Sequence, residues 1–252
     1  MAAATDIMKR TYAPSAMVGQ LYAAVYGSGA ALLPIGNVLE ASTEYKEDVE
    51  KQEDMSKLGG GVHAERRRVS EVTFKAKLAD LNIVNLTRAV LGTASPISAG
   101  TVADAAYTAR LGGLLALPHA GLSAVVLKKG VTIIDAALYE VRPEGIWLPD
   151  TVTGLTEGDA ITVSYSHADQ VVIEALTTGA VELQLRFAGL NEADSGKSVI
   201  IDMHRVSQGV TKQLSFIQDK GFGSLEIEGS LLKDPSKTGA GISSYMRTTH
   251  LG

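Results

Sequence analysis

The sequence of 252 residues contains no cysteine, which excludes disulfide bonds, thiolate catalysis and most zinc or iron–sulfur sites. Aromatic residues make up only 5% of the chain, so a core has to rest on valine, isoleucine, leucine and alanine. That composition favours sheet over helix. No run of about 18 apolar residues occurs, and Met1–Pro14 carries Lys9 and Arg10 without an apolar segment behind them. We therefore expect a soluble cytoplasmic product with no membrane partner.

The chain also lacks an excess of positive charge. Its 23 Lys and Arg against 28 Asp and Glu give a net charge of −5. Proteins that bind DNA without regard to sequence neutralise its phosphates with Lys and Arg, so the charge argues against such binding. The length allows one large β domain or two modest ones, and we expect one main domain with an insertion.

Alternating apolar and polar residues predict strands along most of the chain. The first two, 19–27 and 30–35, are joined by a tight Gly-Ser-Gly turn, and an amphipathic strand is expected at 70–78. Small residues at 93–113 suggest a linker. Shorter strands are expected beyond it, at 124–127, 131–134, 139–141, 145–148, 160–166, 171–175, 180–187, 198–206, 211–216 and 222–232. The predicted organisation is an N-terminal arm (1–18), a β domain (19–100 and 167–252) and a β-rich insertion (101–166).

One short helix is expected over Ile83–Leu91. Asp80 or Asn82 can cap its start, and Gly92 supplies its stop. Ile83, Leu86 and Val90 recur at helical spacing, so this stripe should pack on the core as a cover for the sheet.

Residues 38–54 form an acidic strand, followed by a segment of unusual composition. The acidic side chains are either an ordinary solvated strand face or a surface selected to be negative. The segment 54–68 contains the triplet Gly59–Gly61 and three consecutive arginines. Three glycines disfavour regular structure, so we expect this segment to be irregular and mobile in an isolated subunit, becoming ordered on a partner.

No motif predicts an active site. Gly196-Lys197-Ser198 imitates a phosphate-binding loop, but Asn191 replaces the first glycine and a strand instead of a helix follows, which favours a hairpin. His63, His119, His167, His204 and His250 show no metal-ligand spacing. No nucleophile elbow is present, and Glu226 and Glu228 on one strand face are read as polar alternation. We predict no enzyme activity, no cofactor and no metal.

Several segments, in this order, resemble the tail tube (major tail) proteins of bacteriophages with long non-contractile tails. They are Pro34–Val38 (PIGNV), Gly59–Gly61 before a strand and helix, Leu185–Ala193 (LRFAGLNEA), Ile201–Val206 (IDMHRV) and Leu225–Pro235 (LEIEGSLLKDP). The resemblance covers most of the chain and is weakest over 101–166.

The resemblance implies a mainly β fold: a β-sandwich or barrel subunit with one short helix, closing with its copies into a hexameric ring around a continuous inner β-barrel. Stacked rings would form the virion tail tube, after assembly in the host cytoplasm, and DNA would pass through without specific binding. Implied partners are further copies of the chain, a tape-measure protein in the lumen, and tail terminator and baseplate proteins. The alternative is a related ring component: a tail terminator, a baseplate ring or a type VI secretion tube protein.

Two sets of residues are candidates for these roles. A negative lumen that does not capture DNA is expected from Glu40, Glu44, Glu47, Glu50, Glu182 and Glu226. An inter-subunit loop is expected from Gly59, Gly60, Gly61, Arg66, Arg67 and Arg68, whose arginines would meet acidic groups of an adjacent subunit or ring. A competing arrangement has the acidic strand pair with these arginines between subunits. A nucleotide-dependent enzyme and, for the insertion, a carbohydrate-binding adhesin using Trp147 and Tyr139 are further hypotheses.

Overall fold

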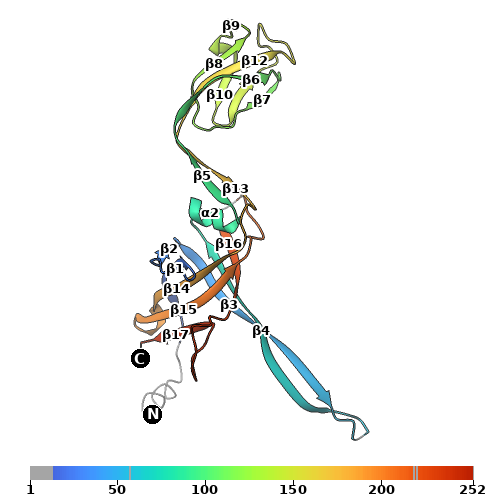
Figure 1. Ribbon diagram of the computed structural model, residues 1–252, viewed down its shortest axis with the longest axis vertical. Coiled ribbons are helices and arrows are strands. Elements are labelled where there is room, and N and C mark those ends of the chain that lie inside the picture. The colour runs from blue at the N-terminus through green and yellow to red at the C-terminus, as the bar shows by residue number, and fades with distance from the viewer. Residues whose placement is uncertain (1–13, 57, 218, 220, 252) are drawn as a thin grey trace. The chain divides into compact units, whose positions relative to one another are not determined.

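A computed structural model describes residues 14–251 except 57, 218 and 220. It is mainly β, with several antiparallel sheets and one α-helix among the described residues, as the sequence predicted (Figure 1). The chain divides into unit 1 (residues 1–93 and 174–252) and unit 2 (residues 94–173). Unit 2 extends beyond the expected insertion at both ends, because β5 (Thr93–Ile97) and β13 (Gln170–Glu174) pair as a two-stranded sheet.

Unit 1 is built on one eight-stranded sheet in the order β2-β1-β14-β15-β16-β4-β3, with β17 also paired to β15. Its strands are β1 (Met17–Val25), β2 (Leu33–Pro34), β3 (Val38–Glu53), β4 (Val62–Leu78), β14 (Val181–Asn191), β15 (Lys197–Gln208), β16 (Leu225–Leu231) and β17 (Met246–His250). The expected N-terminal arm lies outside the described residues up to 13, and its last two residues already belong to β1.

The core of unit 1 follows the two-residue period of its strands. Val72, Phe74, Ala76 and Leu78 of β4 are buried, which confirms the amphipathic strand expected at 70–78. Leu21 of β1, near the opposite end of the strand order, belongs to the same apolar cluster. The sheet therefore curves around a single core instead of lying flat.

The helix α2 (Ile83–Ala89) begins as predicted, because the Asn85 N–H donates to the side-chain oxygen of Asn82 at 2.9 Å. Its predicted inner face is wrong. Asn85 and Ala89 are the buried residues, whereas Ile83 is 48% exposed. The side-chain amide of Asn85 donates to the Ile35 carbonyl at 2.7 Å, so a polar residue takes the inward position.

The helix also ends differently from the prediction. Leu91, with φ of 48°, adopts the left-handed conformation that was expected of Gly92. Gly92 has a different role: a Cβ there would lie 2.6 Å from the Glu174 carbonyl oxygen, so only glycine allows the two backbones to approach.

Unit 2 is a small sandwich of antiparallel sheets. One sheet has the order β6-β12-β8-β9 and another the order β10-β11-β7, and side chains of both form one core in which Leu127, Ile146 and Val163 are each 0% exposed. The elements are β6 (Gly100–Thr108), β7 (Gly113–Ala116), β8 (Ser123–Lys129), β9 (Thr132–Ile133), η1 (Ala136–Leu138), β10 (Glu140–Arg142), β11 (Gly145–Leu148) and β12 (Ala160–His167).

Two segment predictions are wrong. The linker expected at 93–113 contains β5, β6 and the start of β7. Its alanines and glycines hide the alternation of a strand, and β6 is held by its long pairing with β12. Conversely, the strand expected at 211–216 is irregular apart from one bridge between Leu214 and Leu225, and β16 begins at Leu225 instead of Phe222.

Candidate assembly surface

The longest feature of unit 1 is a two-stranded extension, which we call the β3–β4 arm (Lys46–Glu53 and Val62–Glu71). β16 pairs with β4 as far as Thr73. Beyond that point β3 and β4 pair with each other, and no other strand that the structure describes pairs with them (Figure 1). Every described residue of the two arm strands is exposed. The arm thus presents both of its faces outside the core of unit 1.

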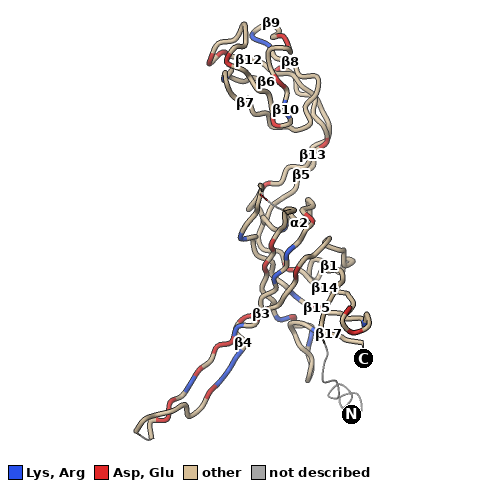
Figure 2. Tube along the Cα trace, turned by 180° about the vertical axis from the view of Figure 1, so that it is seen from behind, with Lys and Arg blue, Asp and Glu red and all other residues tan. Residues whose placement is uncertain are grey.

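Opposite charges lie directly across the two strands of the arm. The register places Lys46 against Glu71, Asp48 against Arg68, Glu50 against Arg66 and Lys51 against Glu65. Such cross-strand pairs favour one register over its alternatives. Figure 2 shows both signs of charge along the arm.

This pairing corrects the prediction for 54–68. Arg66, Arg67 and Arg68 are part of the regular strand β4, which begins at Val62 after β3 has ended at Glu53. The sequence could have predicted this hairpin. When β4 is read in the direction opposite to β3, several charged residues of one strand fall opposite residues of the other sign.

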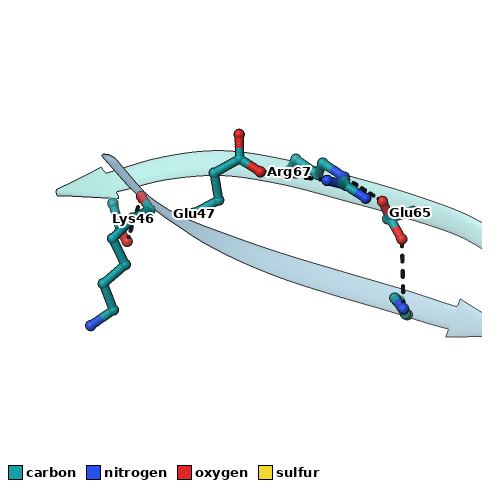
Figure 3. A network of polar contacts seen from close by, with 6 residues as sticks. Lys46, Glu47, Glu65 and Arg67 are labelled. Atoms are coloured by element: carbon teal, nitrogen blue, oxygen red, sulfur yellow. Dashed lines mark hydrogen bonds and ion pairs between the residues drawn. The ribbon is translucent and has the colours of Figure 1, made fainter. Parts of the chain in front are cut away.

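The arginines make ion pairs inside their own chain. Arg67 Nε donates to Glu65 Oε1 at 2.5 Å and its NH1 lies 3.5 Å from Glu47, while Lys51 lies 3.8 Å from Glu65 (Figure 3). Arg66 donates to Glu50 at 2.6 Å. The hydrogen bond from Arg67 lowers the pKa of Glu65, and the same bond raises the pKa of Arg67. Arg66 or Arg67 could therefore contact another subunit only by forming a further ion pair beside these, or by giving up its partner within the chain.

Gly59, Gly60 and Gly61 form the tip of the arm. All three have positive φ, of 104°, 63° and 154°, which side-chain-bearing residues rarely adopt. The Asp54 N–H donates to the Gly61 carbonyl at 2.7 Å and closes the turn. The glycines therefore allow the two long strands to reverse direction.

A second charged surface lies at the base of the arm, and we call it the charged groove. It holds about 320 Å³ and is lined by Glu40 and Glu44 of β3, Lys75 and Lys77 of β4, Glu226 and Glu228 of β16, and Lys212. Three predicted lumen residues, Glu40, Glu44 and Glu226, are thus brought together. Glu228 and the three lysines were not among the predicted residues.

The lysines neutralise most of the negative charge of the charged groove. Lys75 donates to Glu44 at 2.7 Å, Lys77 lies 4.0 Å from Glu226, and Lys212 pairs with Glu228. The hydrogen bond to Glu44 raises the pKa of Lys75, and the hydrogen bond from Lys212 lowers the pKa of Glu228. Four glutamates and three lysines leave one net negative charge in the groove.

The remaining lumen candidates lie elsewhere. Glu47 and Glu50 belong to the β3–β4 arm, and Glu182 lies on β14. Both carboxylate oxygens of Glu182 accept from Arg205, at 2.7 and 2.8 Å, which lowers the pKa of Glu182. The six predicted residues therefore do not form one acidic surface within the subunit.

The phosphate-loop motif forms a hairpin, as predicted. Asn191 ends β14, η2 (Glu192–Asp194) and Gly196 make the turn, and Lys197 begins β15. Lys197 lies 3.5 Å from Asp194 of the same turn. Among the described residues, no three His, Cys, Asp or Glu side chains are placed to hold a metal ion, and no helix is long and apolar enough to cross a membrane.

One protein-family model matches nearly all of the described residues. The matching family model spans residues 14–249 and is described as "Protein of unknown function UCP028589". This chain belongs to that family. The UCP028589 match includes both units, the β3–β4 arm and the charged groove. No curated protein sequence gives a significant match.

Proposed function

We propose that this chain is the subunit of a phage-type tail tube, in which copies close into hexameric rings around a continuous inner β-barrel and the rings stack. The tube would surround a tape-measure protein during assembly and later carry DNA. The observation that carries this proposal is the β3–β4 arm, together with the sequence resemblance of the surrounding strands.

The arm is suited to contact between copies. An isolated two-stranded ribbon is at best marginally stable in water, because it has no third strand and no buried face. Both strands of the arm are exposed along their length, and Val49, Val62 and Val69 are 41%, 57% and 52% exposed. A neighbouring subunit or ring would supply the missing face and bury these valines.

The order of the sheet also suits ring closure. It begins with the short strand β2 and ends with the long strand β3, so no strand among the described residues of unit 1 pairs with the outer edge of β3. Unpaired edges readily add strands from another chain. Head-to-tail contacts between unlike surfaces of identical copies close into rings or extend as filaments.

The charged groove changes the expected character of the lumen. If this face of the sheet lines the pore, each subunit contributes alternating carboxylates and ammonium groups with a small acidic excess. Salt screens exposed charges over about 8 to 10 Å, so the resulting potential would be weak beyond the wall itself. DNA would meet a weakly repulsive surface, which agrees with passage without specific binding.

Electron microscopy of the purified protein tests the proposal. The full chain should form long cylinders of uniform width, whereas a tail terminator or baseplate ring should form single rings. The matched variant replaces residues 47–70, between the paired Lys46 and Glu71, by a two-residue Asn-Gly turn and keeps the rest of the sheet. This variant should stay folded by circular dichroism but form no cylinders. A full chain that remains monomeric at high concentration would contradict the proposal.

A further inference from the structure

A buried histidine on β15 takes no part in the surfaces described above. His204 is 9% exposed, and its backbone N–H donates to the Tyr245 carbonyl at 3.0 Å. No hydrogen bond or ion pair joins its imidazole to another residue that the structure describes. Burying a charge is costly unless the charge is paired, so protonation of this imidazole would work against the fold around it.

His204 points away from the core of unit 1. It directly follows Met203, which is 2% exposed and belongs to that core, and successive side chains of a strand point to opposite faces of the sheet. The register between β14 and β15 also shifts at this point, where β15 has one extra residue between Met203 and Val206. Such a bulge redirects side chains locally. A residue on the outer face would be exposed unless another segment covered it.

The segment between β16 and β17 provides this cover, and we call it the strap (Leu232–Tyr245) (Figure 1). Its first residue donates an N–H to the Arg205 carbonyl at 2.8 Å, and its last accepts the His204 N–H. Between them, Asp234 is 4% exposed and anchors the strap. Its carboxylate accepts from the Tyr26 hydroxyl at 2.9 Å and from the Ser236 hydroxyl at 2.7 Å. The strap is therefore held against β15 at both ends.

The charged groups around the imidazole offer it no free counter-ion. They are Asp202 of β15, Arg247 of β17, and Asp234 and Lys237 of the strap. Asp202 already lies 3.1 Å from Arg186 and 3.4 Å from Arg247. Asp234 is occupied by the hydroxyl groups that anchor the strap. A proton on His204 would therefore face two cations, and both carboxylates near it already have other partners.

We propose that His204 is a pH-sensitive latch, and that protonation of its imidazole releases the strap from β15. Burial first, and then the charge of Lys237, lowers the pKa of His204 in the closed state. The open state therefore binds the proton more tightly. Closure is complete above the ordinary pKa of histidine, about 6.5, and weakens as the pH falls below it. Opening frees the His204 N–H and the Arg205 carbonyl, so this edge of β15 becomes available to another strand.

Amide hydrogen exchange of the full chain, followed by nuclear magnetic resonance, measures the opening. The His204 and Leu232 amides report on it, because both are bonded between the strap and β15. After correction for intrinsic exchange, uptake of one proton raises the opening constant by at most about tenfold per pH unit. We expect at least about a threefold rise from about pH 7.5 to about pH 5.5, a range above the ordinary pKa of carboxylates. The Ile35 amide, bonded to Leu21, should not follow this rise.

Three variants test whether His204 is responsible. His204→Gln cannot take up a proton, so the strap amides should lose their pH dependence. The matched control is His250→Gln, at an exposed histidine of β17, and it should keep the dependence. Lys237→Gln changes an exposed residue of the strap and removes a charge that repels protonated His204, so it should weaken the dependence.

Each result decides for or against the latch. Strap amides whose corrected exchange is the same at both pH values would overturn it, as would a pH dependence that persists in His204→Gln. If His204→Gln does not fold, Lys237→Gln decides, and an unchanged pH dependence in that variant would overturn the inference. None of these measurements requires the chain to assemble, so the latch and the tube are tested separately.

Discussion

Replacing Leu127 by alanine should lower the melting temperature of unit 2 and leave that of unit 1 unchanged. Leu127 is 0% exposed in the core of unit 2, which is separate from the core of unit 1. Removing a buried leucine side chain usually costs about 2 to 5 kcal/mol, including the cavity that it leaves. In a domain of this size each kcal/mol shifts the melting temperature by about 4 to 8 °C, so a decrease of about 8 °C or more is expected.

The chain supplies its own probe for this experiment. Trp147 is the single tryptophan and lies on β11 of unit 2, so tryptophan fluorescence follows the unfolding of unit 2. Far-ultraviolet circular dichroism follows the strands of both units. The matched control is Leu225→Ala, at a residue of unit 1 that is also 0% exposed.

The two variants should act on different transitions. Leu127→Ala should shift the fluorescence transition, and Leu225→Ala should shift the part of the circular dichroism change that fluorescence does not follow. If either variant shifted both transitions equally, the two units would unfold as one cooperative body and the division of the core would be wrong.

Three further predictions concern charge and the chain start. Arg66→Glu places a like charge opposite Glu50, so the backbone amides of the β3–β4 arm should exchange hydrogen faster. Adding Glu50→Arg restores opposite charges and should restore the protection of these amides. Unchanged exchange in Arg66→Glu would contradict the role of this pair. Hydrogen bonding, first from Lys129, lowers the pKa of Asp159 from 3.8 to about 2. The stability that ionised Asp159 gives to the fold is therefore complete above about pH 4 and is lost as the pH falls toward 2. Asp159→Asn should reduce the change of the Trp147 melting temperature with pH over this range. An unchanged pH dependence in this variant would refute the prediction. Finally, the segment Met1–Pro14 has too little apolar content to dock by itself, so we expect it to grip the next ring. Truncation to about Ser15 should give rings that no longer stack, and full-length cylinders from this variant would contradict that role.

Local sequence patterns predicted those elements whose burial follows strand periodicity. Residues 72–78 alternate strictly, and β4 buries the expected face. The short helix and its Asn82 cap were also predictable from side chains near each other in sequence. Its inner face was not, because Asn85 is buried through a hydrogen bond to Ile35, which is distant in sequence.

The candidate surfaces were less predictable. The glycines at 59–61 suggested an irregular segment, yet the charges of β3 and β4 pair across the arm and hold Arg66–Arg68 in a strand. The carboxylates of the charged groove were found in the sequence, but their lysine partners come from other strands and a loop, and only the sheet register brings them together. Charge counted along a strand therefore overestimated the charge of the folded face.

A three-dimensional reconstruction by electron microscopy of the particles formed by the purified chain tests the central claim most directly. The account predicts stacked six-membered rings in which each β3–β4 arm packs against another copy, around a lumen with a small negative charge. Particles without a central lumen, or a cylinder in which the arms extend into solvent without touching another copy, would contradict it.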